Sequence, residues 1–173
     1  MKQAIALLVL AACATPPRAP LDPTTTRAAV LEMAEAVQVA AQVCTHVARY
    51  LGRMGEDERA DKLVADCTRH IIPARDAVMT GADGVDPWKP GSEATAGCAG
   101  KAVLVGLDAV LVDLRAAGYR SPVPVVIDDG RKLGARLEAY ALPSCDPLHP
   151  TTVVTTYESP NIAPVVPVPP GVW

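Results

Sequence analysis

The sequence of 173 residues contains no phenylalanine, and its aromatic residues are limited to 2 Trp and 4 Tyr. Its apolar content comes mainly from alanine, valine and leucine. Small side chains allow helices to approach closely, but each of them buries little surface area. A small core built in this way gains from covalent cross-links, which small domains commonly use.

Positive charge is also scarce. The 16 Lys and Arg residues are outnumbered by 19 Asp and Glu, which gives a net charge of -3, and no basic block interrupts the chain. Since a basic patch is the electrostatic footprint of nucleic-acid recognition, we expect no nucleic acid as a partner. We find no internal repeat of fixed period, and the length fits one domain.

Catalytic motifs are missing as well. No serine lies in a Gly-x-Ser-x-Gly elbow, and His46, His70 and His149 have no obvious acid–base partner in the sequence. We therefore expect a protein that is not an enzyme and that needs no cofactor. The serines are Ser92, Ser121, Ser144 and Ser159.

A zinc site is the one metal site that the sequence suggests, because Cys44 precedes His46 and Cys67 precedes His70 at short spacing. Residues two apart on a helix point about 200° away from each other, so Cys44 and His46 cannot face one ion. Cys67 and His70 can share a face. A three-ligand site would need local unwinding, and we expect no metal.

The chain has no long hydrophobic run at its start. Ala4–Ala14 is too short for a membrane span, which needs about 20 apolar residues. Lys2 precedes this run, which leads into Leu10-Ala11-Ala12-Cys13. A basic start, a short apolar stretch and small residues before a cleavage site form a secretory signal. With the cysteine at its end, the segment resembles the signal of bacterial lipoproteins.

This resemblance implies that residues 1–12 are removed and that Cys13 carries a diacylglycerol thioether and an acylated amine. Two or more acyl chains give stable membrane anchoring. Ala14 stands where an aspartate tends to retain such lipoproteins at the inner membrane, so the resemblance implies the outer membrane, with the protein facing the periplasm. The alternative is an uncleaved apolar N-terminus on a cytosolic protein.

Four cysteines remain once the lipidated residue is set aside: Cys44, Cys67, Cys98 and Cys145. An even number in an exported chain indicates two disulfides, with three possible connectivities. The periplasm is oxidising and permits them. The alternative is four free thiols buried in a cytosolic core.

Residues 13–21 form a proline-rich tether, and the helical pattern begins after it. Asp22 followed by Pro23 is typical of a helix start, and apolar residues then recur at helical spacing to Leu51. A second helix should start near residues 56–58, with Pro73 kinking or ending it. A stretch at 74–79 would continue the same axis, and 81–91 should be a loop.

A third helix is expected from Ser92 to Ala117, apolar on much of its circumference and therefore central. The fourth is expected over 123–142, with a short strand at 123–127 as the alternative. On that helix Gly130 and Gly134 would lie one turn apart and allow a close approach to a neighbour.

These patterns predict an all-α domain over residues 22–145, an antiparallel bundle of about four helices stapled by disulfides. Short connections favour antiparallel neighbours. Folding the first pair of helices brings Cys44 near Cys67, and folding the second pair brings Cys98 near Cys145. We expect these two pairs.

Residues 146–173 are rich in proline and almost free of charge. They predict an extended tail, and polyproline segments are low-entropy ligands for aromatic grooves. The alternative is a tail without a role. The candidate partner-docking residues are Pro164, Pro167, Pro169, Pro170 and Trp173.

The pattern as a whole favours a membrane-anchored binding or scaffolding module with a protein partner in the envelope. One alternative is a phage-encoded envelope lipoprotein, because a lipoprotein signal followed by proline-rich sequence is similar to outer-membrane spanin subunits, which act in lysis. Another is an inhibitor or exclusion protein. A periplasmic hydrolase is the last alternative, without a motif behind it.

Overall fold

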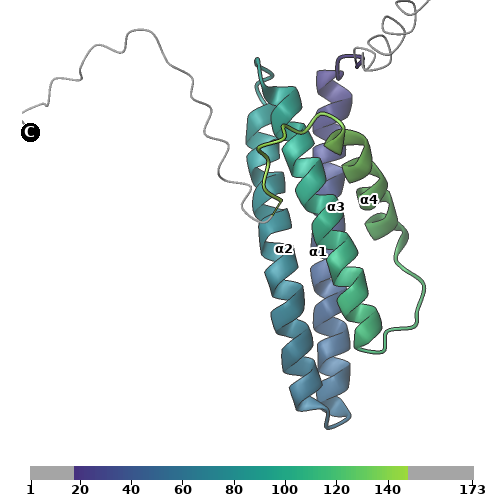
Figure 1. The fold of residues 1–173 in the computed structure, drawn as a ribbon. Helices are drawn as coiled ribbons and strands as arrows, with labels where there is room; N and C mark the ends of the chain where they lie inside the picture. The colour runs from purple at the N-terminus through teal and green to yellow at the C-terminus, as the bar shows by residue number, and fades with distance from the viewer. Residues whose placement is uncertain (1–17, 148–173) are drawn as a thin grey trace, which may run out of the picture.

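The computed structural model describes residues 18–147, which form four α-helices (Figure 1). α1 spans Pro23–Arg53, α2 Asp57–Val85, α3 Ser92–Ala116 and α4 Val125–Glu138. Successive helices run antiparallel, and the described residues contain no strand. The all-α bundle with disulfide staples, expected from the sequence, is confirmed.

α3 is one of two helices that contact all the others. Both α1 and α3 contact the other three helices, whereas α2 and α4 do not contact each other and so lie on opposite sides. By length and composition α3 could also cross a membrane, but most of its apolar stretch is buried inside the bundle. Its burial is that of a core helix, which explains why apolar residues cover much of its circumference.

Glycine and alanine allow the helices to pack very closely. A Cβ atom added at Gly134 of α4 would lie 2.8 Å from the carbonyl oxygen of Gly100 on α3. One added at Gly106 of α3 would lie 2.9 Å from the Cβ of Ala74 on α2. Gly130 of α4 packs in the same way against Ala36 of α1. The close approach expected from the spacing of Gly130 and Gly134 is therefore present.

The two ends of α1 follow from local sequence. The side chain of Asp22 accepts a 2.8 Å hydrogen bond from the Thr25 N–H, and Pro23 occupies the first helical position. Gly55 has a φ of 77°, a left-handed conformation that favours glycine and lets the chain reverse into α2. Gly118, with a φ of 90°, makes the corresponding reversal after α3.

The prediction that a loop begins at residue 81 is wrong. Pro73 lies inside the helix, which continues to Val85, so residues 81–85 are helical and the loop is confined to 86–91. Beyond the proline, a buried stripe keeps the helical spacing. Packing of this stripe offsets the cost of about 3 kcal/mol for a proline inside a helix. The stripe consists of Ala74, Ala77, Val78, Gly81 and Val85.

Ser92 bonds to the C-terminal end of α2. Its buried hydroxyl donates to the Gly84 carbonyl at 2.5 Å and accepts from the Lys89 N–H at 3.0 Å. A single side chain therefore joins the last turn of α2 to the first residue of α3. The sequence indicated only that Ser92 opens a helix.

α4 is shorter than the expected helix over 123–142, and the alternative strand at 123–127 is absent. The helix begins after Pro124, whose backbone is extended, and ends at Glu138. Leu142 precedes Pro143, a position that disfavours helical geometry. Residues 139–147 instead turn back over α3, where Lys101 donates a 3.1 Å hydrogen bond to the Cys145 carbonyl.

The bundle has two distinct ends (Figure 1). The proximal end holds the start of α1, the loop at 86–91 and the end of α4. The distal end holds the turn at 54–56 and the connection at 117–124. α1 has 31 residues, so at 1.5 Å per residue the ends lie about 46 Å apart.

Replacing Gly134 by alanine tests the close packing. The new Cβ would press on the backbone at Gly100, so we expect the free energy of unfolding to fall by about 1–3 kcal/mol, as overpacking does. Gly52 in α1 is the matched control, since its Cβ would meet Asp57 at an ordinary 3.5 Å. Gly52→Ala should raise the free energy of unfolding by up to about 1 kcal/mol through helix propensity.

Urea denaturation followed by circular dichroism measures both variants. A stabilised Gly134→Ala protein would show that the α3–α4 interface is looser than described.

Candidate functional site

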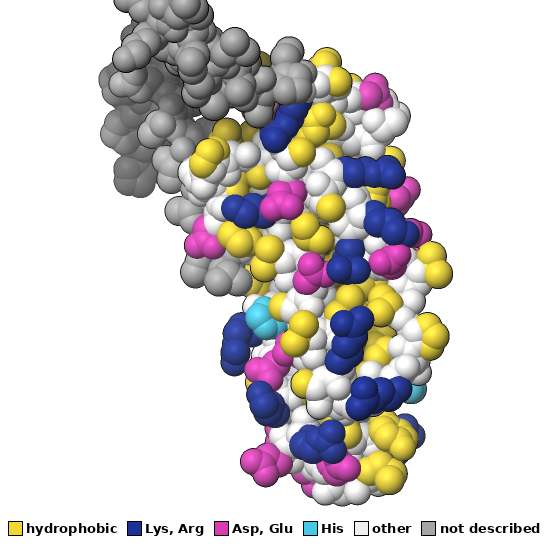
Figure 2. Space-filling view, turned by 45° about the vertical axis from the view of Figure 1, so that its right-hand side comes forward, with side chains coloured by type: hydrophobic (Ala, Val, Ile, Leu, Met, Phe, Trp, Pro, Cys, Tyr) yellow, Lys and Arg dark blue, Asp and Glu magenta, His cyan; other side chains and the backbone are white. Residues whose placement is uncertain are grey.

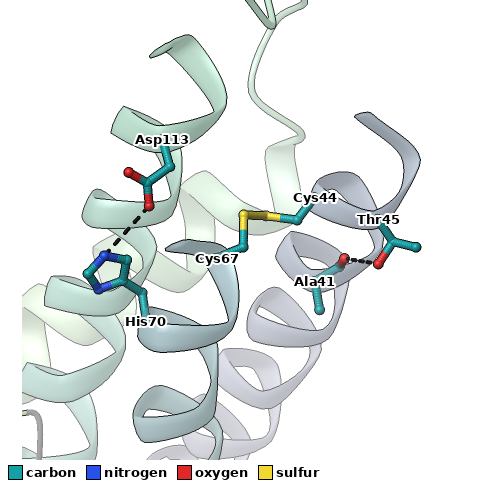
Figure 3. Close-up of a disulfide and its surroundings, with 6 residues drawn as sticks. All are labelled: Ala41, Cys44, Thr45, Cys67, His70 and Asp113. Carbon is teal, nitrogen blue, oxygen red and sulfur yellow. Dashed lines mark hydrogen bonds and ion pairs between the residues drawn. A yellow bond between two sulfur atoms is a disulfide. The ribbon is translucent and has the colours of Figure 1, made fainter. Parts of the chain in front are cut away.

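The four cysteines of the bundle form two disulfides, with the pairing expected from the sequence. Cys44 of α1 bonds to Cys67 of α2, with their Cα atoms 6.5 Å apart (Figure 3). Cys98 of α3 bonds to Cys145 after α4, with a Cα separation of 5.6 Å. All four residues are buried, and they cross-link the bundle rather than form a reactive site.

The zinc arrangement weighed from the sequence is excluded by this pairing. Cys44 and Cys67 are bonded to each other, so neither supplies the thiolate that zinc requires. His46 is exposed on α1, and His70 of α2 faces α3 instead. Within residues 18–147, no three His, Cys, Asp or Glu side chains are grouped so as to hold a metal ion.

The contact between His70 of α2 and Asp113 of α3 was not predicted from the sequence. The imidazole Nε2 lies 3.6 Å from the carboxylate Oδ2, and both side chains are about one-fifth exposed (Figure 3). The Oδ2 atom is buried and receives no hydrogen bond from the described residues. Burial raises the pKa of Asp113, and the charge of His70 acts in the opposite direction. Two helices contribute one residue each, so no local motif indicates the pair.

A pocket of about 290 Å³ lies beside Asp113, between α2 and α3. Asp66 on its wall pairs with Lys62 at 2.7 Å and with Arg69 at 3.3 Å. The lining residues include no serine, threonine or cysteine that could act as a nucleophile. The Asp113 carboxylate and the His70 imidazole therefore meet at the interface of the two helices, beside side chains whose charges are paired. The complete lining is Arg59, Lys62, Leu63, Asp66, Asp113, Ala116 and Ala117.

The distal end carries a surface that is both aromatic and basic. Tyr50 and Tyr119 line a pocket of about 240 Å³ together with His46 and Arg120. Residues at 46, 49, 50 and 53 share one face of α1, because they follow the helical period. We call the following set the distal surface: His46, Arg49, Tyr50, Arg53, Tyr119 and Arg120.

The two segments that form the distal surface carry only positive charge. Neither 45–54 nor 114–127 contains an acidic residue, although each contains two arginines. Acidic residues at this end lie on the first turn of α2, where Glu56 pairs with Arg59 and Asp57 and Glu58 are exposed. Figure 2 shows basic and hydrophobic side chains next to each other on the lower part of the bundle, with acidic ones at the lower left and at the bottom.

The proximal end carries the other two aromatic residues of the described chain. Trp88 and Tyr140 line a hollow of about 560 Å³ with Lys89. The Tyr140 hydroxyl donates a 2.8 Å hydrogen bond to the Ala19 carbonyl, and Arg18 lies 5.8 Å from the centre of its ring. Among residues 18–147, aromatic side chains therefore occur only at the two ends of the bundle.

The remaining predicted site residues lie outside the described residues. They are the lipidation site Cys13 and the docking candidates Pro164, Pro167, Pro169, Pro170 and Trp173.

No protein-family model, no curated protein and no solved structure matches this chain.

Asp113 and Asp66 predict pH effects of opposite sign. Burial raises the pKa of Asp113 in the folded protein, so its contribution to stability is present at low pH and is lost as the pH rises through that pKa. A hydrogen bond from Lys62 lowers the pKa of Asp66, so its contribution is present at neutral pH and is lost on acidification.

Relative to the unchanged protein, Asp113→Asn should thus gain stability between about pH 3 and pH 7, while Asp66→Asn should lose it. Urea denaturation across this range measures both, each variant serving as the control for the other. The same trend in the two variants would contradict the assignment of Asp113 as a carboxyl held out of water.

Proposed function

We propose that the protein is a lipoprotein anchored to the outer membrane through Cys13, with a periplasm-facing bundle that acts as a binding or scaffolding module. The lipoprotein-like signal supports the anchor. Two disulfides in the bundle are compatible with an oxidising compartment such as the periplasm. The single observation that carries the binding role is the aromatic and basic distal surface at the end away from residue 18.

The attachment of the chain to the proximal end supports this arrangement. The Leu21 N–H donates a 2.9 Å hydrogen bond to Glu93 of α3, and Ala19 accepts one from Tyr140. Residues 19–21 are therefore fixed to the proximal end. An anchor at Cys13 would hold this end near the membrane and extend the distal surface about 46 Å from it, the length of α1.

The chemistry of the distal surface selects the partner. Tyrosine and arginine are the residue types that most often carry binding energy at protein interfaces. Tyr50 is 54 % exposed and Met54 beside it is 62 % exposed, so apolar area is available for contact. Arg49, Arg53 and Arg120 form no ion pair among the described residues. Their guanidinium groups are available to carboxylates, which they can bind in a bidentate manner. We therefore propose an acidic segment of an envelope protein as the partner.

The other functions weighed from the sequence gain no support from the described residues. The spanin-like and inhibitor roles rest on the signal and the proline-rich tail alone. A hydrolase role has no motif in the sequence, and no serine, threonine or cysteine lines the pocket beside Asp113. The docking role of Pro164, Pro167, Pro169, Pro170 and Trp173 remains a separate hypothesis.

Mass spectrometry of the protein purified from its host tests the anchor. We expect loss of residues 1–12, acyl mass on Cys13 and no alkylatable thiol at the other four cysteines. Cys13→Ser should leave the protein without acyl mass and outside the membrane fraction, whereas Ala14→Ser should remain there. An intact Met1 with four reactive thiols would refute the proposal.

Photo-crosslinking tests the distal surface. A benzophenone amino acid at Tyr50 should capture a segment rich in Asp and Glu, identified by sequencing the crosslinked peptide. Combined Arg49→Glu and Arg53→Glu should reduce capture about tenfold or more, because like charges then face each other. The positional control is Met79, which is 61 % exposed on α2 in the half toward the proximal end.

Capture that survives the charge reversal, or that occurs equally from position 79, would count against an acidic partner at the distal end.

A further inference from the structure

The proximal end has the composition of a membrane-contacting surface. Trp88 and Tyr140 are half-buried there, each with an apolar ring and a polar group. Arg18 and Lys89 are exposed beside them. Tryptophan and tyrosine concentrate where hydrocarbon meets water, and basic side chains pair with lipid phosphates. We call Arg18, Trp88, Lys89 and Tyr140 the proximal surface.

Three acidic residues at this end are engaged by local partners. Asp22 accepts the hydrogen bond that starts α1, and Asp86 pairs with Arg27 at 2.7 Å. Glu93 accepts from the Leu21 N–H. Each of these three carboxylates has a positive or donor group beside it. Arg18 and Lys89 form no ion pair among the described residues. The proximal surface therefore presents local positive charge to an anionic headgroup layer.

Chain length restricts how far this surface can lie from a lipid on Cys13. Five peptide units separate Cys13 from Arg18 and span at most roughly 18 Å when extended. Arg18 lies 5.8 Å from the ring of Tyr140, and the hydrogen bond from Tyr140 to Ala19 holds the chain against that surface. An acylated Cys13 would hold the proximal surface within this distance of the bilayer.

We infer that the proximal surface rests in the headgroup region of the phospholipid bilayer that holds the anchor. This inference rests on the lipidation of Cys13 proposed above and adds a second contact with the membrane. Trp88 and Tyr140 enter the interface between headgroups and acyl chains, while Arg18 and Lys89 bind phosphates. Two points of contact, the lipid and the surface, restrict the tilt of the bundle, so the distal surface points away from the membrane.

Tryptophan fluorescence in vesicles tests this contact. The lipidated full chain carrying Trp173→Leu keeps Trp88 as its one tryptophan. It is reconstituted into vesicles of phosphatidylethanolamine and phosphatidylglycerol whose acyl chains are brominated near the headgroup. Bromine quenches indole only at short range, so we expect the emission of Trp88 to fall by at least half relative to unbrominated vesicles.

A matched variant places the reporter at the other end. Tyr50→Trp, combined with Trp88→Tyr and Trp173→Leu, puts the single tryptophan on the distal surface, and its emission should be unchanged by bromine. Flotation of each variant with the vesicles is measured in parallel.

The outcomes separate the two proposals. Flotation with strong quenching at position 88 and none at position 50 supports the inference. Flotation without quenching at position 88 overturns it and leaves the lipid anchor in place. Failure of the lipid-bearing preparation to float overturns both.

Discussion

The close approach of α3 to its neighbours through glycine and alanine is the interaction on which the rest of the structure depends. Gly100 and Gly134 bring the backbones of α3 and α4 together, and Gly106 with Ala74 does the same for α3 and α2. Such contacts gain dispersion energy from many atom pairs at short distance. They also leave no room for larger side chains, so the absence of phenylalanine and the geometry of the bundle have the same cause.

Small side chains have a cost, since each removes little apolar surface from water. The disulfides offset part of it by restricting the unfolded chain. Cys44–Cys67 closes a loop with a sequence separation of 23 and Cys98–Cys145 one of 47. In the chain-entropy account these contribute about 3 and about 4 kcal/mol, a sizeable share of the stability of a small domain. The second bond also holds residues 139–147, which have no helix of their own, against α3.

Features set by neighbouring residues could be predicted from the sequence, and features set by other helices could not. Asp22 and Pro23 predicted the start of α1 because a cap is a local hydrogen bond. Antiparallel folding predicted the cysteine pairs because hairpin geometry follows from short turns. The end of α2 was predicted wrongly from Pro73. The helix continues beyond this proline because it packs against α1 and α3, which the local sequence does not show. The pairing of His70 with Asp113 joins two helices and has no signal in either segment.

The positions of the aromatic residues follow from the same packing constraint. A core in which backbones nearly touch cannot hold an indole or a phenol ring, whereas the ends of the bundle have the space. Tyr50 and Tyr119 therefore lie at one end, and Trp88 and Tyr140 at the other. Each pair has basic side chains beside it, so the two ends offer similar combinations of apolar and positively charged groups.

The core therefore fixes the distance between the two ends, and the chain that leads to Cys13 makes them inequivalent. Residues 19–21 are bonded to the proximal end alone. If the anchor is there, lipid is the anionic partner within reach of Trp88, while only a molecule some 46 Å away can meet Tyr50. Under this proposal, two surfaces of similar chemistry would bind different partners because of where a rigid bundle holds them.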